Sequence, residues 1–450
     1  HWVVNNPNDP NTTSWSRRIF NHEFFFKQGL TWTLLNSRTF NVRFLPSGSI
    51  LNVNGPTISF SEMENCHYIL GFLNSKVAAA LVQVINPTAA NNPGDVGKLP
   101  LLFSAEAEVS RRVGLAIDIC KASWDESETS FDFKSFPMAP RVSGGLESGY
   151  DSWRARAQER IAELRAIEEK NNSLFIQLYG LESEMDPSIN AEDITIGVWS
   201  KERWAQGFVS YFMGCNLGRF STSRDGIHYA GKRGLDFEQA PSEDFLADAD
   251  GIVPVTDEAW FADDSAERIS KFLAAVVGVE HVSKSVEWLG ESLGRKNTET
   301  PIETIRRYLA DKFFKDHTQL YRKRPIYWLF SSGKQGAFQA LVYMHRYNEG
   351  TLSRMRSEYV IPLSAKFIGR LEMLEKDAAA SSSAAARTKI QKQIESLRKK
   401  QAELLAYDEK LRHYADMRIS IDLDDGVKAN YSKFGDLVAE SKAITGGSDE

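Results

Sequence analysis

The sequence predicts an α+β protein, in which a β-rich region with packed helices is followed by a mainly helical region containing a coiled-coil-like helical hairpin. Three observations predict this class. Short β-prone runs separated by turn residues occupy positions 1–60. Longer segments with apolar residues at helical spacing follow them. The segment 364–417 is highly charged and carries widely spaced apolar positions, which is typical of helices that pack along one narrow stripe.

Length and composition indicate a folded protein of several domains. A chain of 450 residues suits roughly two to four domains, and 42% hydrophobic residues exclude wholesale disorder. No apolar run reaches the roughly 18 residues of a membrane span. The chain begins with His rather than Met, which suggests a piece of something longer, without a signal peptide. Three widely spaced cysteines fit no zinc pattern and predict a reducing, cytoplasmic environment.

The first predicted domain, 1–140, is β-rich at its start. We expect strands at 31–35, 42–45, 49–53 and 57–60, because turn residues separate these runs. Helices are predicted at about 62–85 and 104–122. The piece SFDFKSFPM alternates like a short strand and ends at a proline.

Three further segments follow this domain. Residues 141–190 predict a linker, VSGGLESGY, and then a charged amphipathic helix at about 153–170. Residues 191–363 predict a mixed, mainly helical domain with a basic segment. Within it, 326–330 suits a strand, whereas Phe338, Leu341, Val342 and His345 have the spacing of a helix face. Residues 364–450 predict two antiparallel helices, divided by DAAASSSAAART, and a C-terminal tail.

The distribution of charge says more than the net charge of −6. Residues 235–264 contain ten acids and no Lys or Arg, whereas residues 300–356 contain eleven Lys plus Arg against four acids. A binding surface responds to local charge rather than to the sum over the molecule. The basic segment is therefore a candidate for contact with a polyanion.

Two local motifs suggest other chemistry but lack its context. Gly226 to Lys232 has phosphate-loop spacing, but Arg233 stands where a magnesium-binding hydroxyl is needed, so a turn is the better interpretation. Ser292 lies in a Gly-x-Ser-x-Gly pattern on a predicted helix end, where a nucleophile elbow would need a preceding strand. The sequence also lacks Gly-x-Gly, an Asn-Pro-Pro-aromatic tetrapeptide, a credible nuclease triplet and a His-Glu-x-x-His metal pair.

The stretch RKRPIYWLFSSGKQGAFQALVYMHRY combines cations and aromatics. The triplet 322–324 precedes a proline, which predicts an extended chain with three side chains fanning outward. Extended cations beside aromatics and the turn 331–334 suit phosphate contact with base stacking. The alternatives are a solvated charge run for the cations and an ordinary core for half of the aromatics.

Ordered blocks through the chain carry a family resemblance. They include HWVVNNPNDP, FFFKQGLTWTLLNSRTFNVRFLPSGSILNVNGPTISF, YILGFLNSKV, NPTAANNPGDVGKLPL, VSYFMGCNLGRFSTSRDGIHYAG, RKRPIYWLFSS, FQALVYMHRY and DLDDGVKANY. In this order they resemble the C-terminal half of the PglX family, adenine-specific DNA methyltransferases of BREX type 1 phage-defence systems. Single blocks are shared with type IIL restriction-modification enzymes, whose specificity part is an alternative.

The resemblance implies that methyl transfer and DNA recognition belong to different parts of the family protein. In the family, an N-terminal domain binds S-adenosylmethionine and carries the Asn-Pro-Pro-aromatic motif, so we expect that cofactor outside this chain and no catalysis by this part alone. Residues 1–140 would be the target-recognition domain, and the rest would complete a clamp on double-stranded DNA. Implied further partners are other BREX subunits and phage DNA-mimic inhibitor proteins. A protein-interaction scaffold and a hydrolase built on Ser292 are the rival interpretations.

Candidate DNA contacts follow from residue types that suit phosphates or base edges. Two arginines near strand ends could fork onto guanine, and two asparagines could read adenine, although ordinary turn chemistry also explains the asparagines. Trp32 is expected to be buried. The predicted set is Arg17, Arg18, Lys27, Asn36, Arg38, Asn41, Arg43, Arg322, Lys323, Arg324, Lys334 and Arg346.

Overall fold

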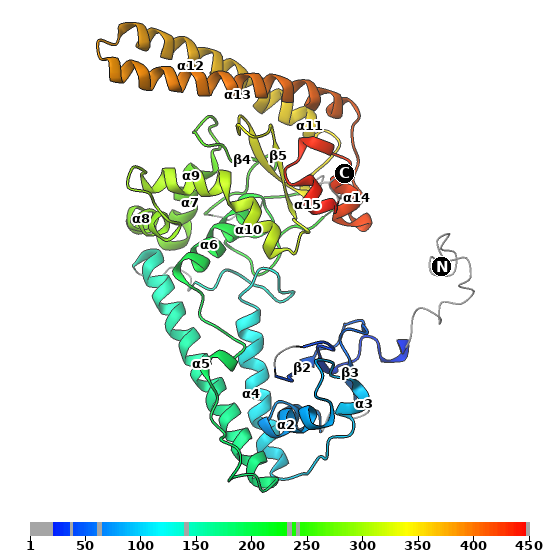
Figure 1. Ribbon diagram of the computed structural model, residues 1–450. Helices are drawn as coiled ribbons and strands as arrows, with labels where there is room; N and C mark the ends of the chain where they lie inside the picture. The colour runs from blue at the N-terminus through cyan, green and yellow to red at the C-terminus, as the bar shows by residue number, and fades with distance from the viewer. Residues whose placement is uncertain are drawn as a thin grey trace, which may run out of the picture. The chain divides into compact units, whose positions relative to one another are not determined.

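The chain folds into two compact units in the computed structural model, which describes residues 21–36, 39–60, 65–138, 144–231, 236–239 and 244–446. Unit 1 comprises His1–Ser123 and Arg156–Gly197, and unit 2 comprises Trp124–Ala155 and Val198–Glu450. Figure 1 shows helices together with small antiparallel sheets, which is the predicted α+β class.

Unit 1 begins with a three-stranded antiparallel sheet of order β2-β1-β3, formed by β1 (Gly29–Trp32), β2 (Val42–Leu45) and β3 (Thr57–Ser59). Leu30, Trp32 and Val42 alternate inward and are buried in the core of the unit. Gly29 has no room for a side chain, because a Cβ there would lie 2.3 Å from the carbonyl oxygen of Ile58. Three of the four predicted strands exist, and residues 49–53 form a loop instead.

The helix predicted at 62–85 is interrupted. It forms α1 (Cys66–Leu73) and α2 (Lys76–Ile85), which meet at an angle of 69°. The Asn74 amide accepts from the backbone N–H of Val42 (2.8 Å) and donates to its carbonyl (2.9 Å), as a neighbouring strand would. Ser75 then caps α2, because its hydroxyl accepts from the N–H of Ala78. The Asn74 side chain at this break therefore holds the end of α1 against β2.

The remainder of unit 1 is helical. It contains α3 (Pro93–Val96), α4 (Glu106–Trp124) up to its last residue, the C-terminal part of α5 (Gly145–Leu178) and the short η3 (Ala191–Asp193). Rings of Tyr68, Phe72 and Phe175 pack edge to face with centroids 5.6 Å apart. These contacts join α1 to α5 and centre the core.

The predicted linker at 142–150 is helical from Gly145 onward, because α5 starts there. In unit 2, the backbone N–H of Gly144 donates to His281 Nε2 (3.2 Å), and that of Leu146 donates to Ser285 Oγ (3.1 Å). A Cβ at Gly145 would lie 2.7 Å from this same Ser285 oxygen. The glycines thus permit close packing at a capped helix start, and the predicted linker is part of a helix from Gly145 onward.

Unit 2 is built around a second antiparallel sheet of order β4-β6-β5, formed by β4 (Ile252–Pro254), β5 (Tyr327–Ser331) and β6 (Gln339–Tyr343). The strand predicted at 326–330 is confirmed. The helix predicted from Phe338 to His345 is wrong, because 339–343 is the central strand. Ala340 to Tyr343 are all buried, so this strand has no polar alternation by which to recognise it.

A group of helices lies beside this sheet (Figure 1). They are α6 (Lys201–Asn216), α7 (Ser265–Val277), α8 (Val282–Ser292), α9 (Pro301–Asp311) and α10 (Phe313–Leu320). α9 starts with a capping box between Thr300 and Glu303. SFDFKSFPM forms turns rather than a strand, and its Phe133 and Phe136 are buried against aromatic residues of α6.

The C-terminal part contains the predicted pair of long helices. After α11 (Thr351–Arg354) and the π-helical turn η6 (Met355–Val360), α12 (Ile361–Ala380) and α13 (Ala384–Asp416) run back along each other (Figure 1). Of the apolar positions that predicted these helices, Ile394, Leu397, Leu404 and Leu411 are buried, and Ile390 is half-buried. Coiled-coil geometry remains a prediction. The short α14 (Gly426–Ser432) and α15 (Ser441–Thr445) complete the unit.

Among the described residues, no individual helix has the length and apolar character needed to cross a membrane; α1 and α2 reach them only as a bent pair.

Candidate nucleic-acid interface

The basic turn, which we define as Arg322, Lys323 and Arg324, follows Tyr321, the C-cap residue that ends α10. The three residues are exposed. They are not extended as predicted, because Arg322 and Lys323 have φ values of 50° and 61°. The backbone N–H of Lys323 donates to the carbonyl of Thr318 (2.8 Å), which closes the helix end in the manner usually served by glycine. A proline follows the triplet as the prediction assumed, but the end of α10 determines the backbone conformation of Arg322 and Lys323.

Internal contacts take up about half of the basic segment. Of its eleven cations, six are paired or buried: Arg306 with Asp264, Arg307 with Glu299, Lys312 with Glu202, Arg354 with Glu358, Arg356 with Asp408, and Arg346 in the interior. The other five form no ion pair or side-chain hydrogen bond with another described residue. These five are Lys315, Arg322, Lys323, Arg324 and Lys334, and all are exposed.

Arg346, another predicted DNA contact, is buried in unit 2 and bonds to the backbone there. Its side chain donates to the carbonyl oxygens of Asp248 (2.7 Å) and Ala249 (2.8 Å), and its guanidinium lies 3.9 Å from the centroid of the Phe237 ring. Only 6% of the residue is exposed. Burial lowers the pKa of Arg346, opposed by the charge of nearby Asp248. In this position the guanidinium does not reach a surface where DNA could lie.

Lys334 lies in the exposed loop between β5 and β6. This loop binds a carboxylate of its own chain, because Ser332 Oγ, the N–H of Gln335 and the N–H of Ala337 donate to the Glu403 carboxylate at 2.7, 2.7 and 3.2 Å. The loop therefore has the donor arrangement of an anion site, already occupied by α13. Only the Lys334 side chain remains for an external phosphate.

In unit 1, the described candidates lie at the sheet and its loops. Arg43 is exposed on β2 opposite Thr31, on the face of the sheet away from the core. Asn36 and Asn41 both donate to the carbonyl of Thr39, at 3.1 and 3.3 Å, which is the local turn chemistry kept as an alternative. Lys27 is exposed. The predicted contacts Arg17, Arg18 and Arg38 lie outside the described residues.

Trp32 is buried, as predicted, and its Nε1–H donates to the carbonyl of Asn91 (2.8 Å). Two exposed aromatics that precede the first strand were missed: Phe24 is 38% and Phe26 59% exposed. The signal available was the run Phe-Phe-Phe-Lys before the first strand. In a β-rich region such a run fits a buried strand equally well, so the sequence alone does not place these rings at the surface.

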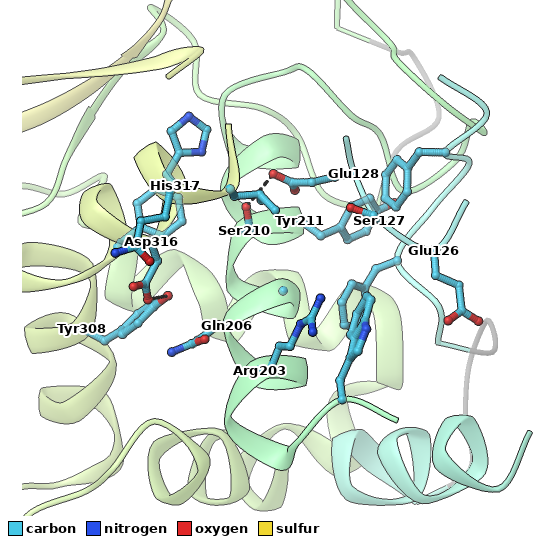
Figure 2. Close-up of a pocket in the computed structure, with 17 residues that line it drawn as sticks. Glu126, Ser127, Glu128, Arg203, Gln206, Ser210, Tyr211, Tyr308, Asp316 and His317 are labelled. Atoms are coloured by element: carbon cyan, nitrogen blue, oxygen red, sulfur yellow. Dashed lines mark hydrogen bonds between the residues drawn. The ribbon is translucent and has the colours of Figure 1, made fainter. Parts of the chain in front are cut away.

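A cavity of about 300 Å³ lies within unit 2, between α6, α10 and the loop that contains Glu126 to Phe136 (Figure 2). Glu128 is buried there, and its carboxylate accepts from Ser210 Oγ (2.9 Å) and the Tyr321 hydroxyl (3.0 Å). Burial raises the pKa of Glu128, opposed by the positive charge of Arg219. This network could not be predicted from the sequence, because the hydrogen-bond partners of Glu128 are Ser210 and Tyr321, which are far from it along the chain.

The cavity lining favours packing over catalysis. His317 Nε2 accepts from the backbone N–H groups of Ile326 (3.1 Å) and Tyr327 (3.2 Å), so this nitrogen is unprotonated. Burial and then the charge of Arg219 hold the pKa of His317 well below its ordinary value. The imidazole is therefore a neutral spacer between α10 and β5 rather than a base facing a substrate.

The other chemical motifs gain no support from the structure. Ser292 is 8% exposed at the end of α8, and its hydroxyl donates to the carbonyl of Trp288 (2.6 Å), as expected for an ordinary helical serine. Gly226 to Gly231 form an irregular loop, and the Lys232 and Arg233 of that motif lie outside the described residues. Groups of three or more His, Cys, Asp or Glu suited to a metal ion are absent from the described part of the chain.

Comparison with known proteins supplies the family. No family model matches the chain. It is 38% identical over 458 residues to the adenine-specific methyltransferase BrxX of Escherichia coli O9:H4 (strain HS), an alignment covering 96% of this chain and 38% of that protein. It is 32% identical over 434 residues to the adenine-specific methyltransferase PglX of Lacticaseibacillus casei (strain Zhang), covering 95% of this chain and 36% of that protein. The chain thus spans under two-fifths of the length of these relatives. Over that span, it belongs to the PglX-type family of adenine-specific methyltransferases.

Proposed function

We propose that this chain is the DNA-recognition and clamping part of a site-specific adenine-N6 DNA methyltransferase in a BREX phage-defence system. One observation carries the proposal: two proteins named adenine-specific methyltransferases match about 95% of this chain, but the chain matches under two-fifths of each. Methyl transfer and the binding of S-adenosylmethionine would then belong to the part of the family protein that this chain does not match. The specificity part of a type IIL restriction-modification enzyme is the closest variant of this function.

Two kinds of contact would divide the work. The basic turn, with Lys315 and Lys334, offers exposed cations that other described residues leave unpaired, which suits the phosphate backbone. Arg43, on the outer face of the first sheet, offers a guanidinium that can fork onto guanine. Arg17, Arg18 and Arg38 remain proposed contacts of the same region.

A duplex titration tests the proposal. The 450-residue chain is titrated into a fluorescently labelled mixed-sequence duplex at about 50 and 200 mM salt, the range over which phosphate contacts show their salt dependence. We expect binding at the lower salt that weakens steeply at the higher. No binding at about 50 mM salt would refute the clamping function.

A second function, as a scaffold for other subunits, is favoured by the α12–α13 hairpin. Its exposed apolar residues Ile361, Ile368 and Leu405 are 45%, 47% and 54% exposed, on helices that extend along each other (Figure 1). The triple variant I361S/I368S/L405S, which removes these exposed apolar side chains, separates the two functions. The scaffold role predicts normal duplex affinity but lost phage defence in cells, whereas the clamping role alone predicts that defence survives.

DNA-mimic inhibitors, if they bind, should compete with duplex at the basic turn.

A further inference from the structure

Phe26 has a backbone conformation that a bulky residue rarely adopts. Its φ is 65°, in the left-handed region, where a side chain is sterically disfavoured. Two backbone hydrogen bonds hold it there: its N–H donates to the carbonyl of Ser49 (2.8 Å), and its carbonyl accepts from the N–H of Gly48 (3.0 Å). The residue is therefore fixed to the turn that follows β2, rather than placed on a loose end.

The ring that this backbone carries is exposed to solvent. Phe26 is 59% exposed, and Ile50, next to its hydrogen-bond partner Ser49, is 65% exposed. The Phe25 ring packs edge to face against Phe26, with centroids 6.4 Å apart and an interplanar angle of 88°. Apart from this contact with Phe25, the Phe26 ring faces water on a strained backbone, so the ring is better explained by a binding partner than by packing.

Positive charge lies beside this aromatic surface. The Lys27 ammonium lies 5.6 Å from the centroid of the Phe24 ring, and Arg43 is exposed on β2 of the same sheet. A described acid in this segment, Glu23, lies 3.5 Å from the His22 ring. An occupant that matches both features must offer flat apolar faces close to negative charge. The bases and phosphates of a nucleic acid have that combination.

We propose that Phe26 is a wedge that stacks on or between DNA bases, with Lys27 on the adjacent phosphate. This inference rests on the proposed function and adds to it a residue that senses base stacking. Apolar side chains that enter a base step unstack it, and the cost is lowest where pairing is already weak. The chain should therefore bind a duplex with one mismatched pair more tightly than the matched duplex.

The left-handed backbone supplies a substitution that separates folding from binding. Phe26→Gly removes the ring, and glycine adopts this φ without strain, so the melting temperature should stay equal or rise. Phe26→Trp keeps a stacking surface. Val84→Ala is the matched control, because Val84 is an 81% exposed apolar residue on α2 of the same unit.

Anisotropy titrations with matched and mismatched 30-base-pair probes are the measurement. We expect Phe26→Gly to lose roughly 5- to 150-fold in affinity for the mismatched duplex, the range for one lost base stack, with an unchanged salt slope. Phe26→Trp and Val84→Ala should behave as the wild type does. If Phe26→Gly keeps both the affinity and the mismatch preference, the wedge is refuted and the ring is left to a protein partner. If the wild type binds no duplex at all, the proposed function fails and the wedge with it.

Discussion

Removing the charge of the basic turn gives the sharpest test of the DNA-clamping function. The variant R322N/K323N/R324Q removes three cations and adds little strain, because asparagine tolerates the left-handed φ of positions 322 and 323. The side chains are exposed and the helix-ending hydrogen bonds are made by backbone atoms, so the fold should be unaffected.

The expected size follows from counterion release. Each neutralised phosphate contributes about 0.9 to the slope of log affinity against log salt, so three lost contacts should make the slope shallower by about 2.7. A fourfold rise in salt would then narrow the affinity gap between wild type and variant by roughly 40-fold. Because phosphate contacts carry no base information, the loss should be equal for all sequences.

Fluorescence anisotropy at four or five salt concentrations measures this slope. The matched control is K389Q/K392Q/K399Q, which removes the same charge from exposed positions of α13. If net charge alone governed binding, both triple variants would lose equally. Equal losses, or a basic-turn variant with the wild-type slope, would refute the assignment of this turn to the phosphate backbone.

Three further outcomes are expected. Arg43→Ala in the full-length enzyme should relax sequence preference at one position, and an unchanged methylated motif in methylome sequencing would remove Arg43 from base readout. Arg306→Leu should lower the free energy of unfolding in urea by about 3–5 kcal/mol, because it removes the ion pair of the buried Asp264 carboxylate. Arg398→Ala breaks an exposed ion pair instead, and it should lower the free energy of unfolding by only about 0–1 kcal/mol. Burial raises the pKa of Glu168 to about 7, above its ordinary 4.5. Between these two pH values the folded state binds more protons than the unfolded state, so the free energy of unfolding falls as pH rises. Glu168→Gln should remove this contribution, and the urea midpoint of the variant should then drop less between pH 5 and pH 8.

Sequence patterns predicted the amphipathic helices well, because one buried stripe determines each of them. Of the apolar stripe expected along the helix at 153–170, Trp153, Ala157, Leu164 and Ile167 are buried on α5, and Ile161 is half-buried. The patterns failed where burial is two-sided. β6 is covered on both faces, so its run of apolar residues fits helix and strand alike, and the helical spacing of Phe338, Leu341 and Val342 was coincidental.

Side-chain partners from distant segments explain the other misses. Asn74 interrupts a helix because it pairs with the backbone of Val42, and the glycines at 144 and 145 start a helix because His281 and Ser285 cap it. Each of these contacts joins residues more than 30 positions apart, which local propensity cannot show. The candidate interface was affected in the same way, since exposure separates Arg43 from the buried Arg346 although both looked like surface cations.

The two charged segments noted in the sequence also pair with each other, and this changes how the basic segment should be counted. Asp264, in the acidic segment, pairs with Arg306, and the carbonyls of Asp248 and Ala249 accept from Arg346. A local excess of +7 therefore does not reach the surface as seven charges. If no internal ion pair opens, five exposed cations without a described partner set the ceiling on phosphate contacts, and at about 0.9 per contact this segment then supplies a salt slope of about 4.5. A measured slope well above that value would require the additional cations of unit 1, and removing Arg43 and Lys27 together should then bring it down toward the ceiling.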